Sequence, residues 1–128
     1  MAADTLCWTD IPVTNLDRAI RFYSAVLGRE VKKMSEPGFE YGLLPHEEQN
    51  ASGCLCVRGD SVGNENQPSQ NGPLIYLSVE GRLDEAVKAA RDNGGKVLQD
   101  RQSIGPHGFR AVIIDSEGNR IALHSSAA

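Results

Sequence analysis

The sequence predicts an α+β fold made of two tandem βαβββ modules, at about residues 5–57 and 73–125. Three observations predict it. Each half of the chain contains an amphipathic helical segment, an apolar strand-like segment precedes each helix, and a polar stretch, residues 58–72, separates the halves. One helix and a few short strands close no core alone, so the halves must pack together as one domain over residues 1–128. We expect an open, cup-shaped mixed sheet with the helices on its outer face.

The first module begins with a strand-like alternation of polar and apolar side chains over residues 6–12. Thr14-Asn15 offers a cap for the helix that follows, whose apolar residues recur at helical spacing over residues 16–27. Gly28 then ends the helix, as a residue in the left-handed conformation commonly does. Short strands separated by proline and glycine are expected at residues 30–34, 39–44 and 53–57.

The second module repeats this order. An apolar strand at residues 74–79 precedes an amphipathic helix at residues 83–93, which Gly94-Gly95 ends. The segment Asp115–Asn119 has the composition of a hairpin turn. The remaining strands are expected at residues 96–99, 108–114 and 120–124.

The composition limits the class of protein. The chain has 128 residues, of which 40% are hydrophobic and 23% charged, as in a globular domain. No apolar run approaches the ~20 residues of a membrane-spanning helix, and Met1 to Asp4 lacks the features of a signal peptide, so we expect a cytoplasmic protein without a membrane partner. A net charge of −4 with scattered basic residues argues against nucleic acid as a partner. The cysteines are interpreted as reduced core thiols: Cys7, Cys54 and Cys56.

Three of the expected strands have one strongly apolar side and one more polar side. The apolar sides should pack on the helices, and they carry Ile11, Val13, Ile75, Leu77, Val79, Ile121 and Leu123. The opposite sides should line the cup, and they carry Trp8, Asp10, Tyr76, Ser78, Arg120, Ala122 and His124. This contrast predicts which face is functional.

Asp10 and His124 are the candidate catalytic residues. A carboxylate that orients an imidazole can form a general acid and base pair near neutral pH. The alternative is structural, with Asp10 bonded to the backbone or to Arg120 and with His124 at a strand end next to Ser125.

Several side chains are candidates to contact a ligand in the cup. Trp8, the only tryptophan, and Tyr76 offer aromatic surface together with an N–H or O–H that fixes a ligand's orientation. His107 lies on a Gly/Pro loop at a strand entrance, where binding residues often sit. The alternative is that the aromatic side chains simply fill the cup. The predicted ligand-binding residues are Trp8, Tyr76, Ser78, His107, Phe109 and Arg120.

An ordered series of motifs covers about residues 6–125. It consists of Asp10–Val13, Leu16–Ala19, Phe22-Tyr23, Val26–Gly28, Leu83–Ala86, Gly94–Val97 and Asp115–His124. In order and spacing this series resembles the vicinal oxygen chelate superfamily, which includes glyoxalase I, bleomycin-resistance proteins and extradiol dioxygenases. The resemblance implies a metal in the cup, held by the first and last strands of each module.

The positions that would supply the metal ligands fall on Trp8, Tyr76 and Ala122, with the fourth near Cys54. Tryptophan and alanine offer no lone pair for a divalent ion, and tyrosine is an infrequent ligand. We therefore expect no metal at the cup centre and no cofactor; the disfavoured alternative is a divalent ion held by other ligands. A site made of His46, His107 and His124 matches no recognised ligand spacing.

Three functions remain open. The first is a bleomycin-resistance-like protein that binds a small molecule in the cup without the classical metal site. The second is a divergent glyoxalase-like lyase, or another enzyme of the superfamily, that uses Asp10 and His124 or a displaced metal. The third is a regulatory domain that senses a metabolite or pairs with another chain. In each case we expect a homodimer, because exposed sheet edges are liabilities unless covered.

Overall fold

The computed structural model of the chain describes residues 5–37, 39–47, 52–57 and 67–127. Most of the predicted linker, residues 58–66, lies outside the described residues. The first module contains β1 (Trp8–Pro12), α1 (Leu16–Leu27), β2 (Lys32–Glu36), β3 (Phe39–Leu43) and β4 (Ser52–Cys56). The second contains β5 (Ile75–Ser78), α2 (Leu83–Asp92), β6 (Lys96–Ser103), the short 3₁₀ helix η1 (Gly105–His107), β7 (Phe109–Ile114) and β8 (Arg120–Ser125).

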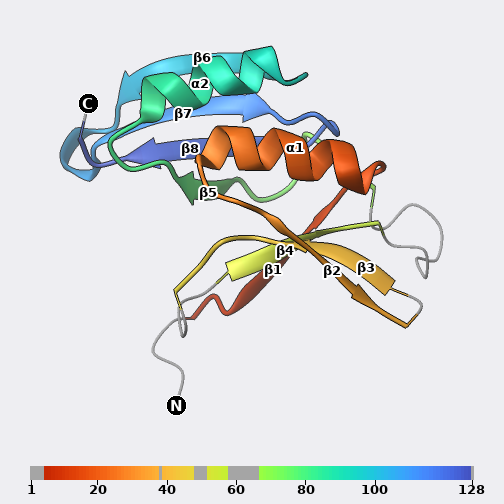
Figure 1. Cartoon of the computed structure of the whole chain (residues 1–128). Helices are drawn as coiled ribbons and strands as arrows, with labels where there is room; N and C mark the ends of the chain where they lie inside the picture. Colours follow the sequence, from red (N-terminus) through yellow and green to blue (C-terminus); the bar gives the residue numbers. More distant parts are fainter. Residues whose placement is uncertain (1–4, 38, 48–51, 58–66, 128) are drawn as a thin grey trace.

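The two modules have the same strand topology (Figure 1). The first sheet has the order β1-β4-β3-β2 and the second the order β5-β8-β7-β6. In each sheet the first strand of the module runs parallel to the last, and the other neighbours are antiparallel. β5 therefore takes the place that β1 has in the first module, which confirms the predicted α+β fold of two βαβββ units. The eight strands of the described residues form two separate open sheets rather than one continuous sheet.

The sequence signals at the ends of α1 act as expected. The side chain of Asn15 accepts a hydrogen bond from the backbone N–H of Arg18 at 3.0 Å, which satisfies an otherwise free donor of the first turn. Gly28 has a φ of 68°, the left-handed conformation that glycine adopts without steric cost. Among the described strands, the largest difference from prediction is β6, which extends past residue 99 to Ser103 through register shifts against β7.

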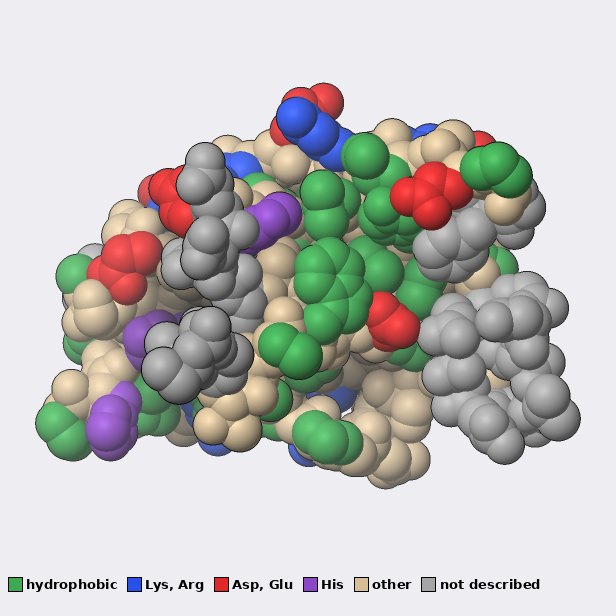
Figure 2. Space-filling view, turned by 90° about the horizontal axis from the view of Figure 1, so that it is seen from below, with side chains coloured by type: hydrophobic (Ala, Val, Ile, Leu, Met, Phe, Trp, Pro, Cys, Tyr) green, Lys and Arg blue, Asp and Glu red, His purple; other side chains and the backbone are tan. Residues whose placement is uncertain are grey.

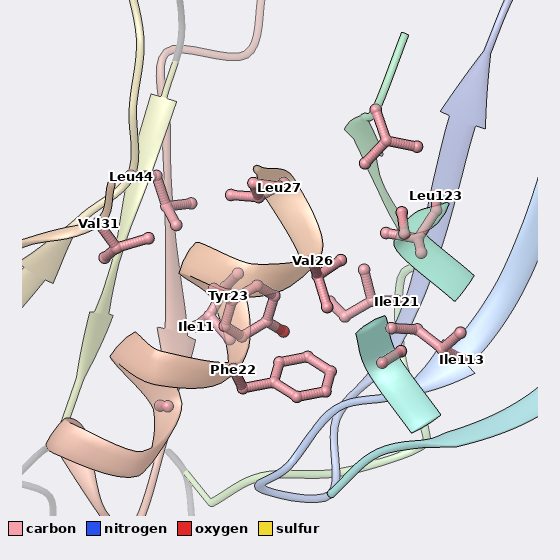
Figure 3. Close-up of a cluster of buried hydrophobic side chains, with 14 of the residues drawn as sticks. Ile11, Phe22, Tyr23, Val26, Leu27, Val31, Leu44, Ile113, Ile121 and Leu123 are labelled. Atoms are coloured by element: carbon pink, nitrogen blue, oxygen red, sulfur yellow. The ribbon is translucent and has the colours of Figure 1, made fainter. Parts of the chain in front are cut away.

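The core lies between the two modules (Figure 3). α1 packs on the first sheet through Tyr23, and on its other side Val26 points toward Ile121 of the second module. α2 packs on the second sheet and also contacts α1. Because the helix-facing sides of both sheets enclose this shared core, the opposite side of each sheet, which we call its open face, points outward.

The turn between β7 and β8 joins the modules. Asp115 is buried, and its Oδ2 accepts a hydrogen bond from the hydroxyl of Tyr23 on α1 at 2.5 Å. Asn119 donates from Nδ2 to the carbonyl oxygen of Pro12 at 2.8 Å, at the end of β1. Burial and the neighbouring Asp115 carboxylate raise the pKa of Tyr23 well above its usual value. These residues of the Asp115–Asn119 motif therefore have a structural role.

Glu117 completes this junction. Its side chain is fully buried, and its carboxylate accepts hydrogen bonds from the Arg18 guanidinium at 2.7 Å and 2.9 Å. The backbone N–H groups of Thr14 and Asn15 also donate to it, each at 2.9 Å. Burial alone would raise the pKa of Glu117, but the bonds from Arg18, Asn15 and Thr14 outweigh it and lower the pKa to about 2.

Among the described helices, neither α1 nor α2 is long and apolar enough to cross a membrane.

Candidate functional site

The predicted alternation of β1 is observed. Ile11 and Val13 are buried in the core, whereas the Trp8 side chain on the opposite side is 47% exposed. Trp8 and Asp10 thus lie on the open face of the first sheet. Figure 2 views the molecule from the side where this sheet lies in Figure 1, and it shows hydrophobic side chains gathered in the middle of that surface.

Asp10 connects the indole to a buried cysteine. The Trp8 Nε1–H donates to Asp10 Oδ1 at 3.0 Å, and the Cys54 thiol donates to the same oxygen at 3.4 Å. The register of β1 and β4 explains this contact, because Asp10 stands directly beside Cys54. Burial, then Cys56 and then Asp10 raise the pKa of the Cys54 thiol to about 12. Cys54 and Cys56 are buried as predicted, whereas Cys7, just before β1, is exposed, contrary to the prediction of a core thiol.

The open face of the second sheet carries a different group. The Tyr76 side chain is 47% exposed, and its hydroxyl accepts a hydrogen bond from Arg110 Nη1 at 2.6 Å. Arg110 also donates from Nε to Gln102 Oε1 at 2.9 Å, and its guanidinium carbon lies 5.9 Å from the centre of the Tyr76 ring. Among the described residues no carboxylate forms a salt bridge with Arg110.

Sequence reasoning missed Arg110 and Gln102, although a signal for Arg110 was present. The Asp115–Asn119 turn pairs Ile114 with Arg120, so counting back along the hairpin pairs Arg110 with His124. A residue beside His124 on the neighbouring strand must share its face.

The two predicted catalytic residues have different partners. His124 lies beside Ser78 on the open face of the second sheet, and its Nε2 donates to the carbonyl oxygen of His107 at 2.7 Å. Because a carbonyl can only accept, this bond places the proton of a neutral His124 on Nε2. Asp10 belongs to the other sheet and is engaged by Trp8 and Cys54. The pairing of Asp10 with His124 stays a prediction.

The remaining predicted ligand-binding residues are distributed over the second module. His107 is exposed in η1, and Phe109 packs at the edge of the core, with the Arg101 guanidinium carbon 5.9 Å from its ring centre. Phe109 therefore faces the helix side, because it alternates in phase with buried residues of β7. Arg120 donates from Nη2 to the carbonyl of Gly72 at 3.1 Å, while its buried Nε has no hydrogen-bond partner.

The register also changes the comparison between the modules. Val13 bonds the carbonyl of Cys56, and Val79 bonds that of His124, at equivalent places in the two sheets. Counting back from these residues, Tyr76 corresponds to Asp10 rather than to Trp8, and the counterpart of Trp8 is Leu74. The prediction that Trp8 and Tyr76 occupy equivalent positions in the two modules was therefore wrong, because the equivalent of Trp8 is Leu74, the preceding residue on the same side of the chain.

With this correction, the positions implied for the superfamily's metal hold Trp8, Cys54, Leu74 and Ala122. Only the thiol is a metal donor, and a divalent ion needs about three protein ligands. These residues do not fit the classical metal. The described residues do bring together another group of donor atoms, those of Asp10, Cys54 and Cys56.

Comparison with known proteins agrees with the topology. The family model of the Glyoxalase/Bleomycin resistance protein/Dioxygenase superfamily matches residues 5–123, and the chain belongs to this superfamily. A glyoxylase-like domain-containing protein of Didymella fabae is 29% identical over 119 residues, which cover 89% of this chain and 88% of that protein.

Solved structures share the fold at low sequence identity. A glyoxalase/bleomycin resistance protein from Albidiferax ferrireducens T118 has a TM-score of 0.73 and 15% identity, over 95% of this chain and 98% of the other. The trypanothione-dependent glyoxalase I of Leishmania major has a TM-score of 0.65 and 20% identity, over 97% and 88% of the two chains.

Proposed function

We propose that this protein binds a small, flat, partly apolar molecule at its open faces, without the superfamily's classical metal. The observation that carries the proposal is the exposure of Trp8 and Tyr76, each 47% exposed and each held by a polar neighbour. Exposed aromatic side chains with a fixed polar edge favour a ligand that stacks and accepts or donates a hydrogen bond.

Arg110 narrows the class of ligand. Its guanidinium is held by Gln102 and the Tyr76 hydroxyl, both neutral groups, so its charge is available to an anionic ligand. A guanidinium recognises a carboxylate through paired hydrogen bonds. The ligand is therefore an aromatic carboxylate or a related molecule with adjacent oxygen atoms, such as a dicarbonyl compound.

A second copy of the chain completes the binding site. The two open faces point away from the shared core, so within one chain they do not form opposite walls of one cup. In a symmetric dimer each copy can supply the wall that the other lacks. We expect light scattering to give the dimer mass; the monomer mass across a wide concentration range would contradict this arrangement.

Calorimetric titration with 2-naphthoate, with the neutral analogue 2-naphthylmethanol and with methylglyoxal tests the ligand class. We expect naphthoate to bind more tightly than its neutral analogue. Arg110→Ala should weaken naphthoate about tenfold or more, because a hydrogen bond to a charged group contributes ~1.5–3 kcal/mol.

Arg91→Ala is the matched control, because Arg91 lies on α2 and pairs with Asp100 at 3.2 Å, away from the open faces. The control should bind naphthoate like the unchanged protein. Failure of all three probes to bind, or equal binding by Arg110→Ala and the unchanged protein, would contradict the proposal.

A further inference from the structure

We propose that Asp10, Cys54 and Cys56 form a metal site for a borderline-soft dication such as Zn²⁺ on the open face of the first module. This site does not depend on the ligand proposed above. It lies within one module and uses two thiolates and one carboxylate.

The geometry comes from the pairing of β1 with β4. Asp10 stands beside Cys54, and Cys56 follows two positions along β4, so all three side chains point to the same side of the sheet. One donor atom from each residue lies within 4.8 Å of the others. Three donors from two hydrogen-bonded strands are held by the backbone, not by flexible loops.

The donors are close to the spacing that a tetrahedral ion requires. Zinc binds sulfur at about 2.3 Å and oxygen at about 2.0–2.2 Å, so tetrahedral donors lie roughly 3.5–3.8 Å apart. The observed separation of at most 4.8 Å closes to this value by small side-chain rotations. Asp10 is exposed, so its carboxylate can move without disturbing the core.

The chemistry of the group favours a cation. A thiol proton now bridges Cys54 and the Asp10 carboxylate at 3.4 Å. Binding of a dication displaces the two thiol protons and places a positive charge among three groups that repel one another when ionised. A fourth position then remains open toward solvent beside Trp8, where water or a ligand oxygen can bind.

The site differs from the one implied by the superfamily resemblance. Cys54 stands at one of the implied ligand positions, but Asp10 and Cys56 are each the next residue on the same face of their strands. Two sulfur donors also change the preference, since thiolates select Zn²⁺ or Cu⁺ over the harder Mg²⁺ and Mn²⁺.

Titration of the reduced full-length protein with Co²⁺ tests the site, since cobalt bound to thiolate gives a charge-transfer absorption in the near ultraviolet. We expect this band to saturate at one equivalent and to disappear when Zn²⁺ is added. Trp8 is the only tryptophan and bonds Asp10, so its fluorescence should change with the same stoichiometry.

Cys54→Ser and Cys56→Ser should each weaken the binding of Co²⁺ roughly 100-fold, and Asp10→Asn on the order of tenfold. Loss of a residue that only orients a metal ligand typically weakens binding roughly 10–100-fold, so loss of a ligand itself should cost at least a comparable factor. Cys7→Ser, which changes an exposed thiol off the site, should bind Co²⁺ normally. Because Asp10 is exposed, Asp10→Asn should leave the protein folded, and it tests the metal site if a serine variant fails to fold. Absence of the band, or its survival in Cys54→Ser and in Asp10→Asn, would overturn the proposal.

Discussion

The two modules share one topology but present opposite chemistry on their open faces. Asp10 in the first module corresponds to Tyr76 in the second, and Cys56 corresponds to His124. The first face therefore groups a carboxylate and thiols around an indole, whereas the second groups Arg110 and an amide around a phenol. The helix-facing sides remain apolar in both. The repeat thus fixes the backbone and the core, while the open faces are free to differ.

The modules also differ in the connection before their last strand. The Asp115–Asn119 turn of the second module is short and supplies buried carboxylates to α1, as at Glu117. The equivalent connection of the first module, between Leu43 and Ser52, is longer, and only part of it is described. In the part described, His46 donates from Nδ1 to the carbonyl of Leu44 at 3.1 Å. The Asp115–Asn119 turn of the second module therefore holds the first module in place, and we call this turn the clamp.

Among the substitutions of polar side chains, Glu117→Gln is expected to have the largest effect on stability. The amide keeps the size of the side chain but removes the charge that Arg18 and the first turn of α1 stabilise. We expect the free energy of unfolding in urea to fall by about 2–3 kcal/mol at neutral pH. A loss below about 0.5 kcal/mol would show that the turn does not hold the modules together.

The same carboxylate predicts a pH dependence. The pKa of Glu117 falls from 4.5 to about 2 on folding. This stabilisation is complete above pH 4.5 and is lost as the pH falls toward 2, with a total of roughly 3 kcal/mol. Glu117→Gln should lose stability less steeply than the unchanged protein over this interval. Parallel curves for the two proteins would contradict the assignment.

Tyr23→Phe is expected to have an intermediate effect. It removes the buried hydroxyl that donates to Asp115 at 2.5 Å and leaves that carboxylate with one bond fewer. We expect a loss of about 1–2 kcal/mol in urea unfolding. Tyr41→Phe is the matched control, because its hydroxyl bonds the exposed Glu36 at 3.3 Å, and it should cost less than about 0.5 kcal/mol. Equal losses in the two variants would remove the distinction between the clamp and the exposed sheet.

The fold was predictable because its signals are local and repeated. The cap at Asn15, the left-handed Gly28 and the period-two alternation of β1 each required only neighbouring residues. The helices were found within one residue of their observed ends: the first at residues 16–27, the second to Asp92 against the predicted 93. β6 was predicted too short, because its register shifts against β7 leave no regular alternation in the sequence.

The candidate site was less predictable, because it depends on which residues become neighbours across strands. Trp8 and Tyr76 follow from alternation alone, and both are exposed as expected. The contacts of Asp10 with Cys54 and of Tyr76 with Arg110 depend on register, which one sequence specifies only where a turn is short. The error that matched Trp8 with Tyr76 has the same origin.

Trp8→Phe should have only a small effect on stability, in contrast to a substitution in the core. The indole is 47% exposed, and its hydrogen bond goes to an exposed carboxylate, so phenylalanine should cost less than about 1 kcal/mol in urea unfolding. Phe22→Ala, in the buried core, should cost about 3–5 kcal/mol by comparison. If Trp8 instead contributes several kcal/mol, its main role is to cover the buried cysteines. A small stability loss combined with weaker binding of 2-naphthoate, measured by calorimetry, would assign the indole to ligand binding.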